Sequence, residues 1–516
     1  MGEARDLQEL NPSPRKLPPG RLDMSNDHSL LDYDPVVPAR PRRTDAGEPA
    51  WDETRPPRDL PHDVAEDAGR GQARRNVARP EAVSAGGRLL RKGHVVSYVG
   101  VFLFTVLLLF RPYELIPALS FLSSAAYWMA IATLLVYLPS QFALEGNLSA
   151  GLREVFLILL LCLAGLLSIP FARNSVEAWD AFNDTFIKAV LIFIVMVNVV
   201  RTEWRLLGLI YLSLGVTVVL SIAAVNDYRA GNFVVEGYRI KGLIGGMFGN
   251  PNDLALHLVT MTPIFVALML GSRNLPGKLI FGAGAVLSVA ANVVTYSRAG
   301  FLGLLGMLVV LLWKLGRGKR FRVSVVGAAC LSLFIALSPG SYGVRVLSIF
   351  IPGLDPVGSS SNRRGILDRS VLVSLRNPLT GIGMGNFHIV SLGETVSHNA
   401  YTQVSAEMGI AALVLYLMLI TAALRRLKRI ELATYAPRRR PRYFYLAVGL
   451  QASIVGYMIS SFFASVAYQW YVYYLVAYAV CLSRLHAAQT AAAGGEASAA
   501  GAAPADTEAA RVGAGA

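Results

Sequence analysis

The stretch from Leu206 to Val225 reads LLGLIYLSLGVTVVLSIAAV and contains no charged side chain. Its length matches the ~20 apolar residues that an α-helix needs to cross the ~30 Å hydrocarbon core of a bilayer. Runs of this kind recur along the chain and predict about twelve transmembrane helices. Their approximate centres are Phe104, Thr133, Cys162, Phe193, Leu214, Val266, Val286, Met307, Ser332, Tyr416, Ile454 and Tyr474.

These runs are uniformly apolar, which decides between the two kinds of structure that can span a bilayer. A closed barrel needs strands that alternate apolar and polar residues, whereas a helix satisfies its own backbone hydrogen bonds. Of the 516 residues, 54% are hydrophobic and 16% are charged, against roughly 25% charged residues in soluble proteins. The sequence predicts an all-α, polytopic integral membrane protein with one membrane domain, at residues 91–486.

The two ends of the chain differ from this domain in composition. Many of the 26 prolines fall between Pro12 and Pro80, in a stretch rich in charge and poor in apolar clusters. Such a stretch buries too little surface to offset the entropy of ordering. We expect residues 1–90 to form a disordered Pro/Arg-rich tail, which stays cytoplasmic because no apolar run opens the chain as a signal peptide. Residues 487–516 are expected to form a disordered Ala/Gly-rich cytoplasmic tail.

The cysteines and the formal charge of +14 exclude several classes of function. Cys162, Cys330 and Cys481 lie in apolar runs without a Cys-x-x-Cys pair, which supports neither a disulfide framework nor a thiolate metal site. In a membrane chain, an excess of Lys and Arg orients the spans more often than it binds nucleic acid. We therefore expect no nucleic-acid partner.

Lys and Arg concentrate in alternate connections, which the positive-inside rule places in the cytoplasm together with both termini. These basic connections contain Arg88, Arg91 and Lys92, Arg201 and Arg205, Arg273 and Lys278, Lys314–Arg322, and Arg425–Arg442. The other connections are then external, at about residues 111–124, 172–186, 226–253, 297–300 and 339–406. The last of these is a long loop between the ninth and tenth spans.

The external connections contain arginines that break the positive-inside pattern. They are Arg229, Arg239, Arg298, Arg345, Arg363, Arg364, Arg369 and Arg376. Cations kept on the disfavoured side indicate an anionic ligand, because guanidinium groups bind phosphate in a fork geometry.

The first external segment contains Arg239 and Lys241, and then Asn250-Pro251-Asn252 at the start of an apolar run. The Asn-Pro-Asn turn is typical of a helix N-cap, so Arg239 and the helix N-terminus could together face an anion. The alternative is an ordinary cap, with Arg239 at the lipid headgroups.

The second segment is the hairpin Tyr296-Ser297-Arg298-Ala299-Gly300 between two apolar runs. An arginine this close to hydrocarbon is costly unless it faces a protein interior or a water-filled cavity. We favour a buried site over the alternative that Arg298 snorkels to phosphate headgroups.

The third segment runs from Pro378 to Gly409. Because no strand–glycine–helix unit surrounds Gly381, Gly383 and Gly385, we interpret them as turn glycines and not as a nucleotide-binding loop. His398 lies at a membrane mouth, where a neutral imidazole could accept a proton from a hydroxyl, although a structural loop histidine is the alternative. Glu407 would lie on the opposite face from His398 if both were on one continuous helix, so we assign it a structural role.

Taken together, these motifs resemble those of the O-antigen ligase and O-antigen polymerase superfamily of bacterial envelope glycosyltransferases. They are, in order, Arg239-x-x-Gly242, Asn250-Pro251-Asn252, Ser297-Arg298-x-Gly300, Pro378 to Phe387, His398-Asn399-x-Tyr401 and Glu407-x-Gly409. The resemblance covers about residues 94–485. It departs from the family pattern at Thr402, where the family often has an apolar residue, and in the long Pro-rich N-terminal tail.

The resemblance implies transfer of a glycan from undecaprenyl diphosphate at the periplasmic face of the inner membrane, without a metal, cofactor or nucleotide sugar. Arg239 and Arg298 match the arginines that hold the donor diphosphate, and His398 matches the histidine near the acceptor. The implied partners are the lipid-linked glycan donor, membrane lipids, and a glycan, lipid A core or protein acceptor. The supporting site residues are Lys241, Asn250, Asn252, Asn399, Tyr401 and Glu407.

The residue chemistry agrees with that implication, because fixed guanidinium groups in a dry cleft can stabilise a departing diphosphate as metal ions do elsewhere. We expect metal-independent, inverting transfer, with His398 orienting or deprotonating the acceptor hydroxyl. A transporter or flippase of a lipid-linked or anionic substrate is the alternative, since cavity-facing arginines would serve it equally well. The choice between ligase and polymerase is also open.

Topology gives the first prediction. Because Lys314–Arg322 and Arg425–Arg442 are the densest basic connections, both should be cytoplasmic and residues 339–406 external. In a chain whose native cysteines are replaced by alanine, an impermeant thiol reagent added outside the inner membrane should label Ser360→Cys but not Gly318→Cys. The reverse pattern would invert the topology and separate the proposed site from its donor.

Overall fold

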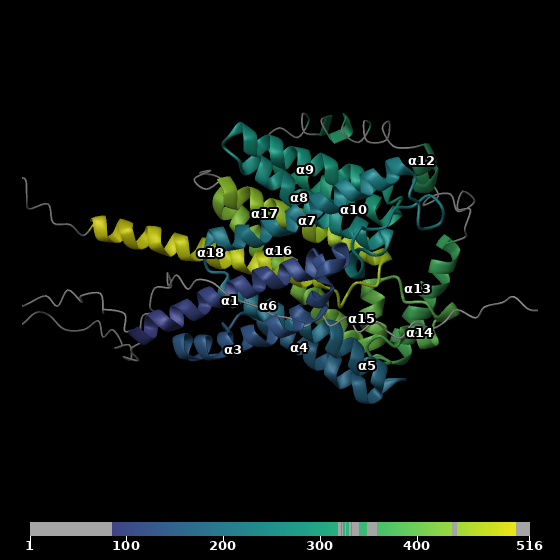
Figure 1. Cartoon of the computed structure of the whole chain (residues 1–516), viewed down its shortest axis with the longest axis horizontal. Coiled ribbons are helices and arrows are strands. Elements are labelled where there is room, and N and C mark those ends of the chain that lie inside the picture. The colour runs from purple at the N-terminus through teal and green to yellow at the C-terminus, as the bar shows by residue number, and fades with distance from the viewer. Residues whose placement is uncertain are drawn as a thin grey trace, which may run out of the picture. The chain divides into compact units, whose positions relative to one another are not determined.

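The computed structural model describes residues 85–317, 340–347, 359–435 and 441–501, together with a few residues between 321 and 332. Contacts within the chain group Leu90–Ala487 into one compact unit, and all interactions below lie inside it. The long helices (Figure 1) are α1 (Ala85–Leu109), α3 (Ala125–Glu145), α4 (Arg153–Ser168), α6 (Ile187–Val199), α7 (Glu203–Ala230), α8 (Pro251–Gly271), α9 (Leu275–Val294), α10 (Arg298–Leu315), α13 (Ser359–Arg376), α16 (Ile410–Tyr435), α17 (Pro441–Ser460) and α18 (Trp470–Gly501).

The shorter elements join the long ones or cover their ends. They are α2 (Pro112–Leu115), η1 (Pro117–Ser124), η2 (Ile169–Phe171), α5 (Ser175–Ala181), η3 (Phe182–Phe186), η4 (Gly246–Phe248), α12 (Gly340–Leu347), α14 (Phe387–Val390), η6 (Leu392–Glu394), α15 (Ala400–Met408) and η7 (Ser461–Phe463). Within the described residues, extended pairing is limited to one isolated bridge between Val235 and Arg239. The predicted all-α fold class is confirmed.

Among the described residues, ten helices are long and apolar enough to cross a membrane. They contain ten of the predicted centres. The predicted span around Ser332 falls mostly outside the described residues, and Tyr474 lies in α18, which is not among the ten. The total of about twelve spans therefore stays a prediction. At the predicted domain boundaries, α1 begins at Ala85 and α18 continues to Gly501, while the rest of both predicted tails lies outside the described residues.

Polar side chains at membrane depth pair with one another across the helix contacts. Thr105 of α1 and Tyr474 of α18 place their hydroxyl oxygens 3.1 Å apart. Ser213 of α7 does the same with Tyr478 of α18, at 3.0 Å. Because hydrocarbon offers no alternative partner, such pairs fix which helix faces meet. Helix α18 is buried along most of its first half and so forms the centre of the domain.

Glycines let α8, α9, α10 and α17 approach one another closely. A Cβ atom at Gly449 of α17 would lie 2.6 Å from the Cβ of Ala267 in α8. One at Gly284 of α9 would overlap the ring of Phe265 in α8. Small residues at such contacts are the usual means of packing helices tightly in a membrane.

Ion pairs join the helix ends that lie near the basic connections. Arg426 of α16 donates two hydrogen bonds, of 2.7 and 2.6 Å, to the two carboxylate oxygens of Glu154 in α4. Lys314 and Arg317 both pair with Glu431 of α16, at 2.6 and 3.0 Å. Glu154 and Glu431 are buried, and a buried carboxylate needs such a partner because its desolvation is costly.

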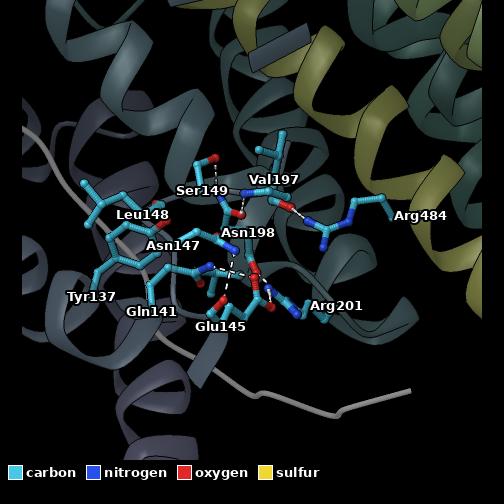
Figure 2. A network of polar contacts seen from close by, with 12 residues as sticks. Tyr137, Gln141, Glu145, Asn147, Leu148, Ser149, Val197, Asn198, Arg201 and Arg484 are labelled. Atoms are coloured by element: carbon cyan, nitrogen blue, oxygen red, sulfur yellow. Dashed lines mark hydrogen bonds and ion pairs between the residues drawn. The ribbon is translucent and has the colours of Figure 1, made fainter. Parts of the chain in front are cut away.

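A second polar network joins α3, the residues that follow it, α6, the connection between α6 and α7, and α18 at these ends (Figure 2). Asn198 accepts a hydrogen bond from the amide of Ala150 and donates one to the Ser149 hydroxyl, each 2.8 Å long. Arg201 pairs with Glu145, and Arg484 of α18 donates to the carbonyl of Val197. The network contains most of the polar side chains of the connection between α3 and α4.

Arg201 and Arg205 were predicted as charges that orient a cytoplasmic connection, and the structure gives both a packing role as well. The Arg205 side chain is buried and donates a 3.0 Å hydrogen bond to the carbonyl of Val199. The guanidinium of Arg201 reaches Glu145 on a helix far away in sequence. Neither side chain is a freely solvated loop charge.

The ion pairs give a prediction about stability. Arg426→Ala leaves the buried Glu154 carboxylate unpaired and should lower the free energy of unfolding by about 3–5 kcal/mol. Arg442→Ala is the matched control, because Arg442 and its partner Glu203 are both substantially exposed and such pairs contribute about 0–1 kcal/mol. Denaturant unfolding in detergent would measure both variants. Equal losses in the two variants would contradict the special role of the buried pair.

Candidate active site

Each of the three predicted motif segments contains the N-cap of a helix. Asn250 caps α8 by accepting a 2.9 Å hydrogen bond from the amide of Asn252. Ser297 caps α10, and Asn399 caps α15 by accepting bonds of 2.9 and 3.1 Å from the next turn. Helix N-termini carry a partial positive charge and unpaired N–H groups, which suit them to anions.

Arg239 connects the first segment to the second. Its side chain is only about 4% exposed, and it donates hydrogen bonds to the carbonyl of Thr295, the carboxylate of Glu236 and the side-chain oxygen of Asn252, of 3.0, 3.1 and 2.8 Å. The same Asn252 oxygen accepts a 2.9 Å hydrogen bond from the hydroxyl of Ser297. Arg239 therefore lies inside the protein, beside the start of α10.

The hairpin that carries Arg298 is tightly enclosed. Arg298 is half-buried, whereas Ser297 and Gly300 beside it are buried. A Cβ atom at Gly300 would lie 2.7 Å from the side-chain oxygen of Asn292. The carbonyl of Ala299 accepts a 3.1 Å hydrogen bond from Ser460, the last residue of α17. By contrast, Lys241 is exposed.

The end of α17 also binds the third segment. Ser461 donates a 3.4 Å hydrogen bond to the hydroxyl of Tyr401 in α15, and that hydroxyl donates a 2.7 Å bond to the carbonyl of Met458 in α17. The hydroxyls of Ser397 and Ser465 lie 3.4 Å apart. The segments around Arg298 and His398, distant in sequence, thus both contact one helix end.

His398 lies directly before the N-cap of α15, in the left-handed region with φ of 51°. This conformation is uncommon for a residue other than glycine and is typical of positions that the surrounding structure constrains. Burial and the positive charge of Arg363 lower the pKa of His398 below its ordinary value. The imidazole is therefore neutral near pH 7 and can accept a proton.

The helical-wheel argument for Glu407 does not apply, because α15 begins at Ala400, after His398. The Glu407 carboxylate is buried and accepts a 3.2 Å hydrogen bond from the amide of Phe387. Burial raises the pKa of Glu407 to about 7, although hydrogen bonds from the Gly385 amide and the Tyr468 hydroxyl act in the opposite direction. Glu407 thus holds the glycine-containing turn against α15.

That turn follows the backbone of α15 closely. The amides of Ile382 and Gly383 donate hydrogen bonds of 2.9 and 3.0 Å to the carbonyls of Ala406 and Glu407. Gly381, Gly383 and Gly385 have φ values of 68°, 97° and 71°, which fits their interpretation as turn glycines.

Sequence reasoning missed two charged groups near the site. Arg111 pairs with Glu114, and the Glu114 carboxylate accepts a 2.7 Å hydrogen bond from the amide of Gly245 in the connection that precedes α8. Arg363 was noted only as one of several external arginines, and nothing in the sequence indicated that it acts on His398. The signal for Arg111 was its place at the end of the first apolar run. Among the residues that the structure describes, no group of three or more His, Cys, Asp or Glu could hold a metal ion.

The turn yields a prediction about stability. Gly383→Ala should destabilise the domain, because the new methyl group would overlap Ala172 and the residue would be held at positive φ. Gly393→Ala is the control, because Gly393 has a φ of +67° in open space and so should cost only the ~1–2 kcal/mol of the left-handed conformation. Denaturant unfolding compares the two variants. A smaller loss for Gly383→Ala than for Gly393→Ala would contradict this packing.

Residues 283–417 match the family model described as O-antigen ligase. The matched region contains Arg298, the glycine turn, His398 and Glu407, but not Arg239 or Asn250. A search of curated proteins found no match. The family match confirms the resemblance to the O-antigen ligase and polymerase superfamily and supports a membrane glycosyltransferase in general terms. With the ten apolar helices, it fits a multi-pass inner-membrane protein.

Proposed function

We propose that this protein transfers a glycan from undecaprenyl diphosphate to an acceptor hydroxyl at the periplasmic face of the bacterial inner membrane, as an O-antigen ligase or a polysaccharide polymerase. The observation that carries the proposal is the meeting of two motifs at the end of α17. Ser460 bonds to the segment of Arg298, and Ser461 bonds to Tyr401, three residues after His398. The segment of Arg298, which would bind the anion, and the segment of His398, which would accept the proton, are therefore both bonded to the end of α17.

In this proposal the donor diphosphate binds at the N-termini of α8 and α10. Arg298 is the half-buried guanidinium at the start of α10, where the partial positive charge of the helix adds to its own. Arg239 already holds one carboxylate, that of Glu236, at 3.1 Å. A phosphate oxygen of the donor would replace that carboxylate on Arg239, with Asn252 and the Thr295 carbonyl keeping the guanidinium in place.

The chemical step is a displacement at the anomeric carbon of the donor sugar. The acceptor oxygen forms a new bond to that carbon from the face opposite the diphosphate, and the bond to the diphosphate oxygen breaks with its electron pair. Arg239 and Arg298 stabilise the negative charge of the leaving diphosphate. The neutral imidazole of His398 accepts the hydroxyl proton and later releases it to water. Configuration at the anomeric carbon is inverted, and the step requires no metal.

The remaining site residues position these groups. Asn250 caps α8 on the donor side and Asn399 caps α15 beside His398, and Asn252 links Arg239 to Ser297. Tyr401 fixes α15 to α17, and Glu407 fixes the glycine-containing turn. Lys241, two residues after Arg239, is exposed and adds positive charge to this segment.

Separating donor binding from turnover tests the proposal. We expect His398→Ala to keep donor binding and to lower turnover by about 10²–10⁴-fold, the usual contribution of a general base. Arg298→Lys should weaken donor binding, because lysine keeps the charge but loses the two-pronged geometry. His388→Ala is the matched histidine control, since the His388 imidazole is directed to Glu177 of α5, at 3.3 Å.

Donor binding is measured with a fluorescent undecaprenyl-diphosphate glycan, and turnover under saturating donor. If His398→Ala abolishes donor binding while bound donor still reacts, His398 is a donor ligand and the assigned roles are wrong. Unchanged donor binding in Arg298→Lys would favour headgroup contact for that arginine.

A further inference from the structure

Helix α13, in the long connection that the sequence predicts to be external, carries a net positive charge. It contains four arginines, Arg363, Arg364, Arg369 and Arg376, and one acid, Asp368. Figure 1 shows α13 beside α14 and α15, at one end of the long helices. None of the ten candidate spans includes it.

Two side-chain hydrogen bonds fix the direction of α13 relative to α15. The Ser370 hydroxyl donates a 3.0 Å bond to the Thr402 hydroxyl, and the hydroxyls of Ser374 and Ser405 lie 2.8 Å apart. Residue numbers rise together along both helices, so α13 and α15 run parallel. The start of α13 therefore lies beside the residues that precede α15, where His398 is found.

The inward face of α13 continues to Arg363. Ile366 is buried in a cluster with Ile382 and Phe387 of the glycine-turn region. Ser370, four positions later, faces α15, and Arg363 precedes Ile366 by three positions. Because residues three and four apart share a helix face, Arg363 lies on the face turned toward α15 and is half-buried. Arg364 beside it is exposed.

Together with burial, the positive charge of Arg363 acts on His398 and lowers the pKa of the imidazole. Two features thus place this guanidinium near the proton acceptor: the parallel register of the helices and the electrostatic effect. The hydroxyl bond between Ser370 and Thr402 also explains the departure at Thr402, since an apolar residue there would remove the hydrogen-bond acceptor that holds α13.

We infer that Arg363 and Arg364 form an acceptor subsite for an anionic group, a phosphate or a carboxylate on the acceptor, and so bring its hydroxyl to His398. Guanidinium groups bind both of these anions through paired hydrogen bonds. The inference rests on the proposed function and extends it, because it assigns a chemical class to the acceptor. Arg369 is not assigned to the subsite at the start of α13, since its Nε is directed to α14, where it donates a 2.9 Å hydrogen bond to the carbonyl of Val390.

The test compares three oligosaccharides of one backbone, which are neutral, phosphorylated or carboxylated. Their binding to the full-length protein in detergent is measured without donor, so the result does not depend on catalysis. We expect the wild-type protein to bind an anionic oligosaccharide more tightly than the neutral one, and the preferred anion identifies the group. Arg363→Gln should weaken binding of that anion by on the order of tenfold to a hundredfold, as for a lost charge-assisted hydrogen bond, and leave the neutral one unchanged.

Arg376→Gln is the matched control, because it removes the same charge from the other end of α13, where Arg376 is exposed. The inference is overturned if Arg376→Gln lowers the affinity for the anionic oligosaccharide as much as Arg363→Gln does. It is also overturned if Arg363→Gln lowers the affinity for the neutral oligosaccharide equally, or if the wild-type protein binds the neutral and anionic oligosaccharides with the same affinity. Failure of the proposed function would instead appear as absent glycan transfer by a wild-type protein whose charge-dependent binding is intact.

Discussion

The absence of water in the hydrocarbon core is the constraint on which this structure depends. Every backbone N–H and C=O at that depth must find a partner within the protein, so the chain crosses as helices and keeps irregular backbone at their ends. The first turn of a helix leaves N–H groups unpaired, and side chains must cap them. Asn250, Ser297 and Asn399 do so, at the segments that also carry Arg239, Arg298 and His398. The residues that cap these helices and the residues proposed to act on the substrates therefore lie in the same short stretches of sequence.

The end of α17 contacts two parts of the site that lie far apart in the sequence. Its last residue, Ser460, bonds to the start of α10, and Ser461 bonds to Tyr401 in α15. Glycines at the contacts of α17 with α8 and α10 allow the close approach that these short hydroxyl side chains require. At the opposite helix ends, buried pairs such as Arg426 with Glu154 fix the bundle. These contacts place the segments of Arg298 and His398 on one bundle of helices.

Local sequence signals predicted the spans and the capped motifs. The partners of the site side chains depend on contacts between residues distant in sequence, which the sequence could not predict. Hydropathy located the helix around Leu214 because a span must be apolar along its own length. The Asn-Pro-Asn turn indicated the N-cap at Asn250 for the same local reason. In contrast, Arg239 reaches Thr295 and Asn252 through contacts that no spacing rule reports. The helical wheel for Glu407 assumes one continuous helix, and this condition is not met, because the cap residue Asn399 starts a new helix after His398.

The proposed reaction breaks the bond between glycan and diphosphate and does not merely move the donor across the bilayer. The most direct measurement uses vesicles that contain the purified full-length protein, an undecaprenyl-diphosphate oligosaccharide, and candidate acceptors including lipid A core and a second lipid-linked glycan. Mass spectrometry then follows every glycan-bearing species. We expect free undecaprenyl diphosphate and an acceptor heavier by the whole glycan, in equal amounts. Intact donor that changes leaflet while all glycan masses stay constant would contradict the proposed reaction.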